Sequence, residues 1–125
     1  SFEGQLSSVR REASVKYINN DQCSKIYSKD HISQNMMCTD SSNEGIDACQ
    51  GDSGGPLIKK GDSANQDIAV GIVSWGVGCA IDPGVYARIS SEIDWIESKV
   101  NEYGGQMRTD CASDSYEKTC MVEDN

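Results

Sequence analysis

The hexapeptide at residues 51–56, Gly-Asp-Ser-Gly-Gly-Pro, constrains the fold of this chain more than any other stretch. Three glycines in six residues permit a tight turn, because glycine adopts backbone conformations that other residues avoid. Such a turn can aim backbone N–H groups inward, where they would stabilise the oxyanion formed when a serine attacks a carbonyl. Residues 51–56 therefore predict a turn that presents Ser53 as a nucleophile, although Gly-Asp-Ser-Gly by itself is also common in ordinary loops.

Short strands separated by glycine-containing turns are predicted for much of the chain. Alternating or β-forming residues indicate strands at residues 12–18, 56–58, 68–75 and 84–89. Residues 19–43 form a polar stretch rich in turn formers, with an apolar patch at Met36 and Met37 before Cys38. Strands of this length and spacing favour an antiparallel barrel or sandwich.

One helix is predicted after the last strand, because five apolar residues recur at spacings of four and three along the chain. These residues are Ile89, Ile93, Ile96, Val100 and Tyr103. Ser91 is the expected N-terminal cap, with Asp94 three residues further on. The glycines at positions 104 and 105 are expected to end the helix.

The acidic balance of the chain argues against nucleic-acid binding. The sequence has 20 Asp and Glu against 11 Lys and Arg, a formal net charge of -9, whereas phosphate recognition needs a basic surface. No apolar run approaches the roughly 20 residues that span a bilayer. Ser1 opens a polar stretch without the features of a signal peptide, so the chain reads as part of a longer product.

Six cysteines and a single histidine, His31, occur in the 125 residues. One histidine without a C-x-x-C pair does not make a zinc cluster, so we expect neither a metal nor a cofactor. Disulfide bonds formed in an oxidising compartment are the expected use of the cysteines. Arithmetic alone leaves 15 pairings open.

Three strings in this order, residues 47–57, 74–79 and 83–86, resemble the nucleophile loop and specificity pocket of trypsin-like serine proteases of the chymotrypsin family. The resemblance implies an all-β fold: an antiparallel β-barrel, the second of that family's two and here incomplete, with a C-terminal α-helix. Residues 1–104 would be the C-terminal portion of the protease domain. Residues 105–125 would be an acidic, cysteine-containing tail.

The resemblance also implies a role for each residue of the nucleophile loop. Ser53 would be the nucleophile, and the N–H groups of Gly51 and Ser53 would form the oxyanion hole. Asp52 would form a buried ion pair with the amine that zymogen cleavage creates. The start of this chain at Ser1 does not resemble the start that supplies this amine in the family.

The pocket that receives the substrate side chain would have Asp47 at its floor, where a carboxylate pairs with Arg or Lys. Gly76 and Gly84 would line the pocket walls. Ser74, Trp75 and Gly76 would pair with the substrate backbone as an added strand. These assignments imply cleavage after arginine or lysine.

The sequence departs from the family in two places. The loop between Cys79 and Gly84 is shorter than in many trypsin-like members and carries Asp82, which bears on subsite preference more than on the Arg/Lys preference. No segment resembles the family's histidine and aspartate motifs. The residues around His31 do not match either motif, so we expect a histidine in a surface loop.

Disulfide pairings follow from the resemblance and not from the counting. It implies that Cys49 pairs with Cys79 and Cys23 with Cys38. Cys111 and Cys120 lie beyond the family's terminal helix, and either bridge each other or reach a segment outside the chain.

The resemblance thus implies a secreted serine endopeptidase, a hydrolase of which this chain is a fragment. Its partners would be protein or peptide substrates with Arg or Lys before the cleaved bond, the missing N-terminal part of the domain, and protein protease inhibitors, with no nucleic acid or membrane. The isolated chain is expected to be inactive because it lacks the general base. The alternative is a non-catalytic protease homologue that acts as a binding or regulatory module.

Overall fold

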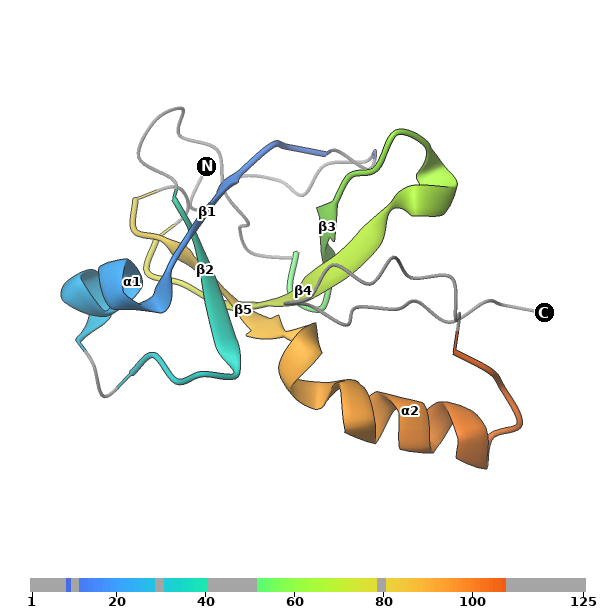
Figure 1. Cartoon of the computed structure of the whole chain (residues 1–125). Helices are drawn as coiled ribbons and strands as arrows, with labels where there is room; N and C mark the ends of the chain where they lie inside the picture. The colour runs from blue at the N-terminus through green and yellow to red at the C-terminus, as the bar shows by residue number, and fades with distance from the viewer. Residues whose placement is uncertain (1–8, 10–11, 29–30, 41–51, 79–80, 108–125) are drawn as a thin grey trace.

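The computed structural model describes residues 9, 12–28, 31–40, 52–78 and 81–107. Five strands and two helices form its regular elements (Figure 1). The strands are β1 (Lys16–Ile18), β2 (Met36–Asp40), β3 (Pro56–Lys59), β4 (Ile68–Trp75) and β5 (Gly84–Arg88). The helices are α1 (Asn20–Tyr27) and α2 (Ile93–Glu102), with 3-10 turns η1 (Ala64–Gln66) and η2 (Ile89–Glu92).

The strands form one antiparallel sheet in the order β1-β2-β5-β4-β3. Since neighbours alternate in direction, the two edge strands, β1 and β3, run the same way. The arrangement is a five-stranded half-barrel followed by a C-terminal helix, which is the second barrel of the chymotrypsin-like fold. The predicted fold class is therefore confirmed.

A small core lies between β2, β5 and α1. Cys23 and Cys38 are fully buried, and Val85 is 1% exposed. A disulfide bond joins Cys23 of α1 to Cys38 of β2, which confirms this predicted pairing. A disulfide bond stabilises a fold largely by restricting the unfolded chain. This bond also joins α1, a short helix with one buried residue, to β2.

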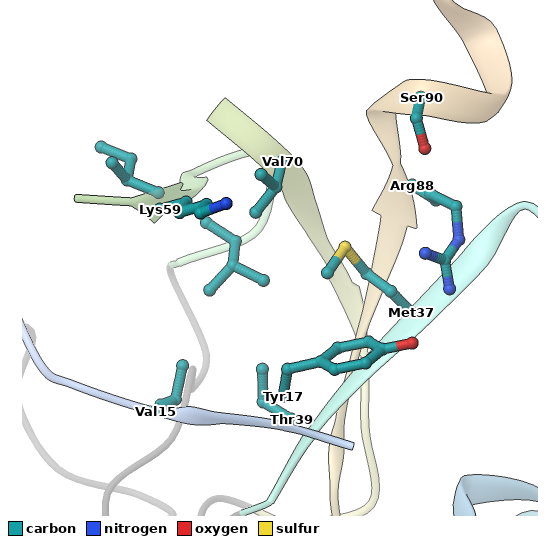
Figure 2. A pocket seen from close by; sticks show the side chains of 10 residues that line it. Val15, Tyr17, Met37, Thr39, Lys59, Val70, Arg88 and Ser90 are labelled. Carbon is teal, nitrogen blue, oxygen red and sulfur yellow. The ribbon is translucent and has the colours of Figure 1, made fainter. Parts of the chain in front are cut away.

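The concave face of the half-barrel holds a cavity of about 290 Å³ between the edge strands (Figure 2). Tyr17 and Val15 line it from the β1 side, and Lys59 and Leu57 line it from β3. Lys60, directly after β3, has its Nζ 2.6 Å from Oε1 of Glu12, which precedes β1, and this hydrogen bond raises the pKa of Lys60. The edges thus approach each other without pairing in the part of the chain that the structure describes.

Residues 19–43 are more regular than the polar, turn-rich stretch that the sequence indicated. They contain α1, whose start is capped by Asn19 as its Oδ1 accepts the N–H of Gln22 at 2.8 Å, and β2, which pairs with β1 and β5. Residues 12–18 form less strand than expected, because β1 begins only at Lys16.

The terminal helix is confirmed, with a different start. The N-cap of α2 is Glu92 without a side-chain capping bond, while Ser91 Oγ donates to Gln34 O at 3.4 Å. Gly104 has φ +79° and ends the helix as predicted. Tyr103, expected on the apolar stripe, is 82% exposed.

Candidate active site

The predicted nucleophile lies in a tight turn at residues 52–55. The N–H of Gly55 donates to Asp52 O at 2.8 Å, and Gly54 has φ +81°. A positive φ at the third position is the requirement of a type II turn, which glycine meets without steric cost. Ser53 occupies the second position, and its side chain is exposed. The turn therefore holds the serine at the surface.

Two backbone hydrogen bonds fix this turn to β4. Gly54 N–H donates to Val73 O at 3.0 Å, and Val73 N–H donates to Gly55 O at 2.9 Å. Since Val73 directly precedes Ser74, the turn that carries Ser53 is joined to the strand end that leads into Ser74, Trp75 and Gly76. The structure thus brings together two of the sequence strings that predicted the site.

The predicted pocket walls also lie side by side. Trp75 pairs with Val85 in the β4–β5 ladder. A Cβ atom on Gly76 would lie 3.8 Å from the Cα of Gly84 and 3.6 Å from Pro83 O. Gly76 is exposed and Gly84 is buried. The end of β4 and the start of β5 therefore run together at the position where the walls were predicted.

Tyr27, the last residue of α1, contacts both walls and was missed by the sequence analysis. Its Oη donates to Pro83 O at 2.6 Å and accepts the N–H of Val77 at 3.3 Å. Its ring meets Trp75 edge-on, with centroids 5.0 Å apart. A signal was present: Tyr27 follows Cys23 by four residues, which places both on one face of a helix.

His31 is exposed, as predicted, and its hydrogen bonds are local. Its Nδ1 lies 2.8 Å from Ser28 Oγ and 3.0 Å from Tyr27 O. Among the residues that the structure describes, no group of three or more His, Cys, Asp or Glu side chains is arranged to hold a metal ion.

Several predicted site residues lie outside the described residues: Asp47, Gly51, Cys49, Cys79, Cys111 and Cys120. Of the predicted oxyanion hole, only Ser53 is described. Asp52 is described and its side chain is exposed. The roles of all these residues stay predictions.

Within the described ranges, neither helix has the length and apolar character needed to cross a membrane.

The sequence of this chain matches the model of a known protein family. Residues 1–96 match the family model described as Trypsin. This match covers most of the 125 residues and includes the turn at residues 52–55 and both candidate pocket walls. The chain therefore belongs to the trypsin family of serine proteases.

Proposed function

We propose that this chain supplies the nucleophile, oxyanion hole and specificity pocket of a trypsin-like endopeptidase that cleaves proteins after arginine or lysine. The observation that carries the proposal is the 52–55 turn, which exposes Ser53 and is hydrogen-bonded to β4 beside the candidate pocket wall. Membership of the trypsin family supports peptidase chemistry on protein substrates.

In this proposal the Oγ of Ser53 attacks the carbonyl carbon of the scissile bond. The N–H groups of Gly51 and Ser53 stabilise the oxyanion that forms. Asp52 pairs with a new N-terminal amine after activation, and this pair orders the loop. Burial of the Asp52 carboxylate would be costly unless this amine accompanies it.

The floor and walls of one pocket would recognise the substrate side chain before the cleaved bond. Asp47 pairs with the guanidinium or ammonium group, and the absence of side chains on Gly76 and Gly84 leaves room for a long residue. Ser74, Trp75 and Gly76 pair with the substrate backbone as an added strand.

The general base and its orienting aspartate would come from sequence outside these 125 residues. His31, the single histidine of the chain, is hydrogen-bonded at the end of α1. Without a base the serine keeps its proton, so the isolated chain is inactive.

The organisation and location of the protein complete the proposal. Residues 1–104 are the C-terminal portion of the protease domain, and residues 105–125 are an acidic tail. The protein is secreted, which the Cys23–Cys38 bond supports because disulfides persist in oxidising compartments. Its partners are protein substrates, protein protease inhibitors and the N-terminal part of the domain.

Peptide substrates that differ only in the residue before the cleaved bond test this function. The protein would be produced from the complete coding sequence that contains these 125 residues. We expect kcat/KM for Arg and Lys substrates to exceed that for Ala by roughly 1,000-fold or more, because a buried ion pair is lost with Ala. Ser53→Ala should lower kcat by about a million-fold, as loss of a serine nucleophile does elsewhere.

Two matched variants serve as controls. Ser98→Ala changes an exposed serine of α2, and Asp62→Ser changes an exposed aspartate after β3; both should leave kcat/KM unchanged. Asp47→Ser should abolish the preference for Arg and Lys. A protein that binds Arg peptides without cleaving them, and whose Ser53 does not react with a fluorophosphonate, would be a non-catalytic homologue instead.

A further inference from the structure

We infer that the peptide bond between Lys60 and Gly61 is a site of limited proteolysis for an endopeptidase that cleaves after lysine, and that two acidic residues restrain its cleavage. The bond lies directly after β3, in the connection to β4 at the tip of this hairpin (Figure 1). Cleavage adds water across the bond: the C–N link breaks, Lys60 gains a carboxylate and Gly61 gains a free amine. The inference does not require this chain to be an enzyme, so it goes beyond the proposed function.

Lys60 differs from the other described lysines and arginine in the place of the bond that follows it. The others lie within helices or strands: Lys16 in β1, Lys25 in α1, Lys59 in β3, Arg88 in β5 and Lys99 in α2. Endopeptidases bind their substrates as extended strands, so a bond inside a helix or a sheet is cut only after that element opens. Among the described residues, Lys60 is the one whose following bond lies outside these elements.

The connection around this bond is exposed along its length. Residues 58–66 are all exposed, and η1, which lies within the connection, has no buried residue. The β3–β4 ladder ends with the pair Lys59 and Ile68, so residues 60–67 lie outside it. Segments with few buried contacts open locally at a low cost in free energy. The chain on both sides of Lys60 can therefore straighten while the sheet stays closed.

Glu12 and Asp67 hold the loop in its resting form. The N–H of Gly61 donates to Asp67 Oδ1 at 3.0 Å, and a Cβ atom on Gly61 would lie 2.3 Å from Cβ of Gln66. Lys60 Nζ lies 2.6 Å from Glu12 Oε1. This hydrogen bond is the main cause that raises the pKa of Lys60, and the charge of Asp67 adds to it.

Cleavage requires both contacts to be released. The Lys60 side chain must leave Glu12 to enter the specificity pocket of the endopeptidase, and the N–H of Gly61 must leave Asp67 as the chain straightens. The two side chains of the ion pair are 66% and 82% exposed, and exposed pairs contribute little to stability. The two contacts therefore slow cleavage without preventing it.

The cut would leave the sheet joined. The β3–β4 ladder ends before the cleaved bond, at Lys59 and Ile68, and the turn at residues 52–55 stays hydrogen-bonded to Val73. We expect the cut protein to elute as one particle in size-exclusion chromatography, and to separate into two pieces when it is denatured and reduced. Pieces that separate in native buffer would show that cleavage here is not limited.

The test uses Ser53→Ala protein made from the complete coding sequence, which excludes self-cleavage, with lysyl endopeptidase as the probe. We expect a product that begins at Gly61, identified by N-terminal sequencing and intact mass, to form at least about tenfold faster than products of cleavage after any other described lysine. Lys60→Gln should remove this product. Lys59→Gln, the matched control beside it, should keep it.

Glu12→Gln and Asp67→Ala test the restraint. Each should speed the formation of the Gly61 product severalfold, because each releases one of the two contacts that hold the resting loop. Glu97→Gln is the matched control, since Glu97 is exposed on α2, and it should leave the rate unchanged. Equal rates for all three variants would overturn the restraint.

A native protein that is cut after another described lysine as early as after Lys60 overturns the inference. Wild-type protein added to the Ser53→Ala protein then distinguishes two sources of the cut. A Gly61 product in this mixture identifies a second copy of the protein as the endopeptidase, whereas its absence, with cleavage by the probe, assigns the site to a different endopeptidase. The proposed function is judged separately, by the peptide substrates of the wild type.

Discussion

Gly54 shows how one residue type can determine the geometry of the turn that carries Ser53, the proposed nucleophile. Its φ of +81° is strained for any side chain, although no heavy atom lies within 4 Å of where a Cβ would be. The cost of a larger residue there is therefore conformational, about 1 kcal/mol. Gly104, at the end of α2, has φ +79° and equally open surroundings.

This pair gives a matched experiment. Gly54→Ala and Gly104→Ala should each lower the free energy of unfolding by about 1 kcal/mol, measured by urea denaturation. Only Gly54→Ala should slow the reaction of Ser53 with a fluorophosphonate, by roughly 100-fold, because small displacements of a reacting group have effects of this size. Equal reactivity of the two variants would show that the 52–55 turn does not position Ser53.

The sequence predicted the residues of this turn more completely than the residues that support the pocket. The glycines around Ser53 are a local signal: the turn has φ +81° at Gly54, and a Cβ atom on Gly55 would lie 2.8 Å from Asp52 O. Tyr27, which lies beside the candidate pocket walls, is hydrogen-bonded to Val77 and Pro83, which lie 50 and 56 residues away in the sequence. No local pattern encodes contacts of that separation.

Arg88 connects three elements of the half-barrel. Its Nη2 donates to Asn20 Oδ1 of α1 at 3.2 Å and to Met36 O of β2 at 3.0 Å. Its Nε also donates to Gln34 O at 3.1 Å. The guanidinium therefore joins the end of β5 to the start of α1 and to the loop before β2.

We expect Arg88→Met to lower the free energy of unfolding by about 2 kcal/mol, because it keeps most of the aliphatic stem and removes charged hydrogen bonds. Lys99→Met is the control, since Lys99 forms a solvent-exposed ion pair with Glu102, and such pairs contribute little. Urea denaturation of the complete protein measures both. Equal effects of the two substitutions would contradict a connecting role for Arg88.

The elements α1 and β2 were not predicted from the sequence, and the burial of their residues explains why. α1 has one buried residue, Cys23, so it shows no apolar stripe. In β2 three consecutive residues are buried, because Met37 and Thr39 line the cavity while Cys38 bonds to α1. Burial on both faces removes the alternation that identifies a strand. β4, in contrast, has the bounds that its run of β-forming residues predicted.

At the scale of the whole molecule, the direction of the edge strands β1 and β3 determines which further strand could pair with them. β1 and β3 run the same way and line one cavity, so a strand antiparallel to both would pair with each of them. Among the residues that the structure describes no strand takes this place, and an unpaired strand edge is open to pairing with another chain. Six hydrophobic residues are buried among those that the structure describes: Cys23, Ile32, Met37, Cys38, Val85 and Tyr86.

So small a core should not support cooperative folding, because each ordered residue costs about 1 to 2 kcal/mol of backbone entropy. We therefore expect residues 1–104, produced alone, to show no cooperative thermal transition by near-ultraviolet circular dichroism and to bind the dye ANS, as states with exposed apolar surface do. The protein made from the complete coding sequence should melt cooperatively and bind little dye. A soluble 1–104 fragment with a sharp transition and no dye binding would mean that the half-barrel is stable as it stands.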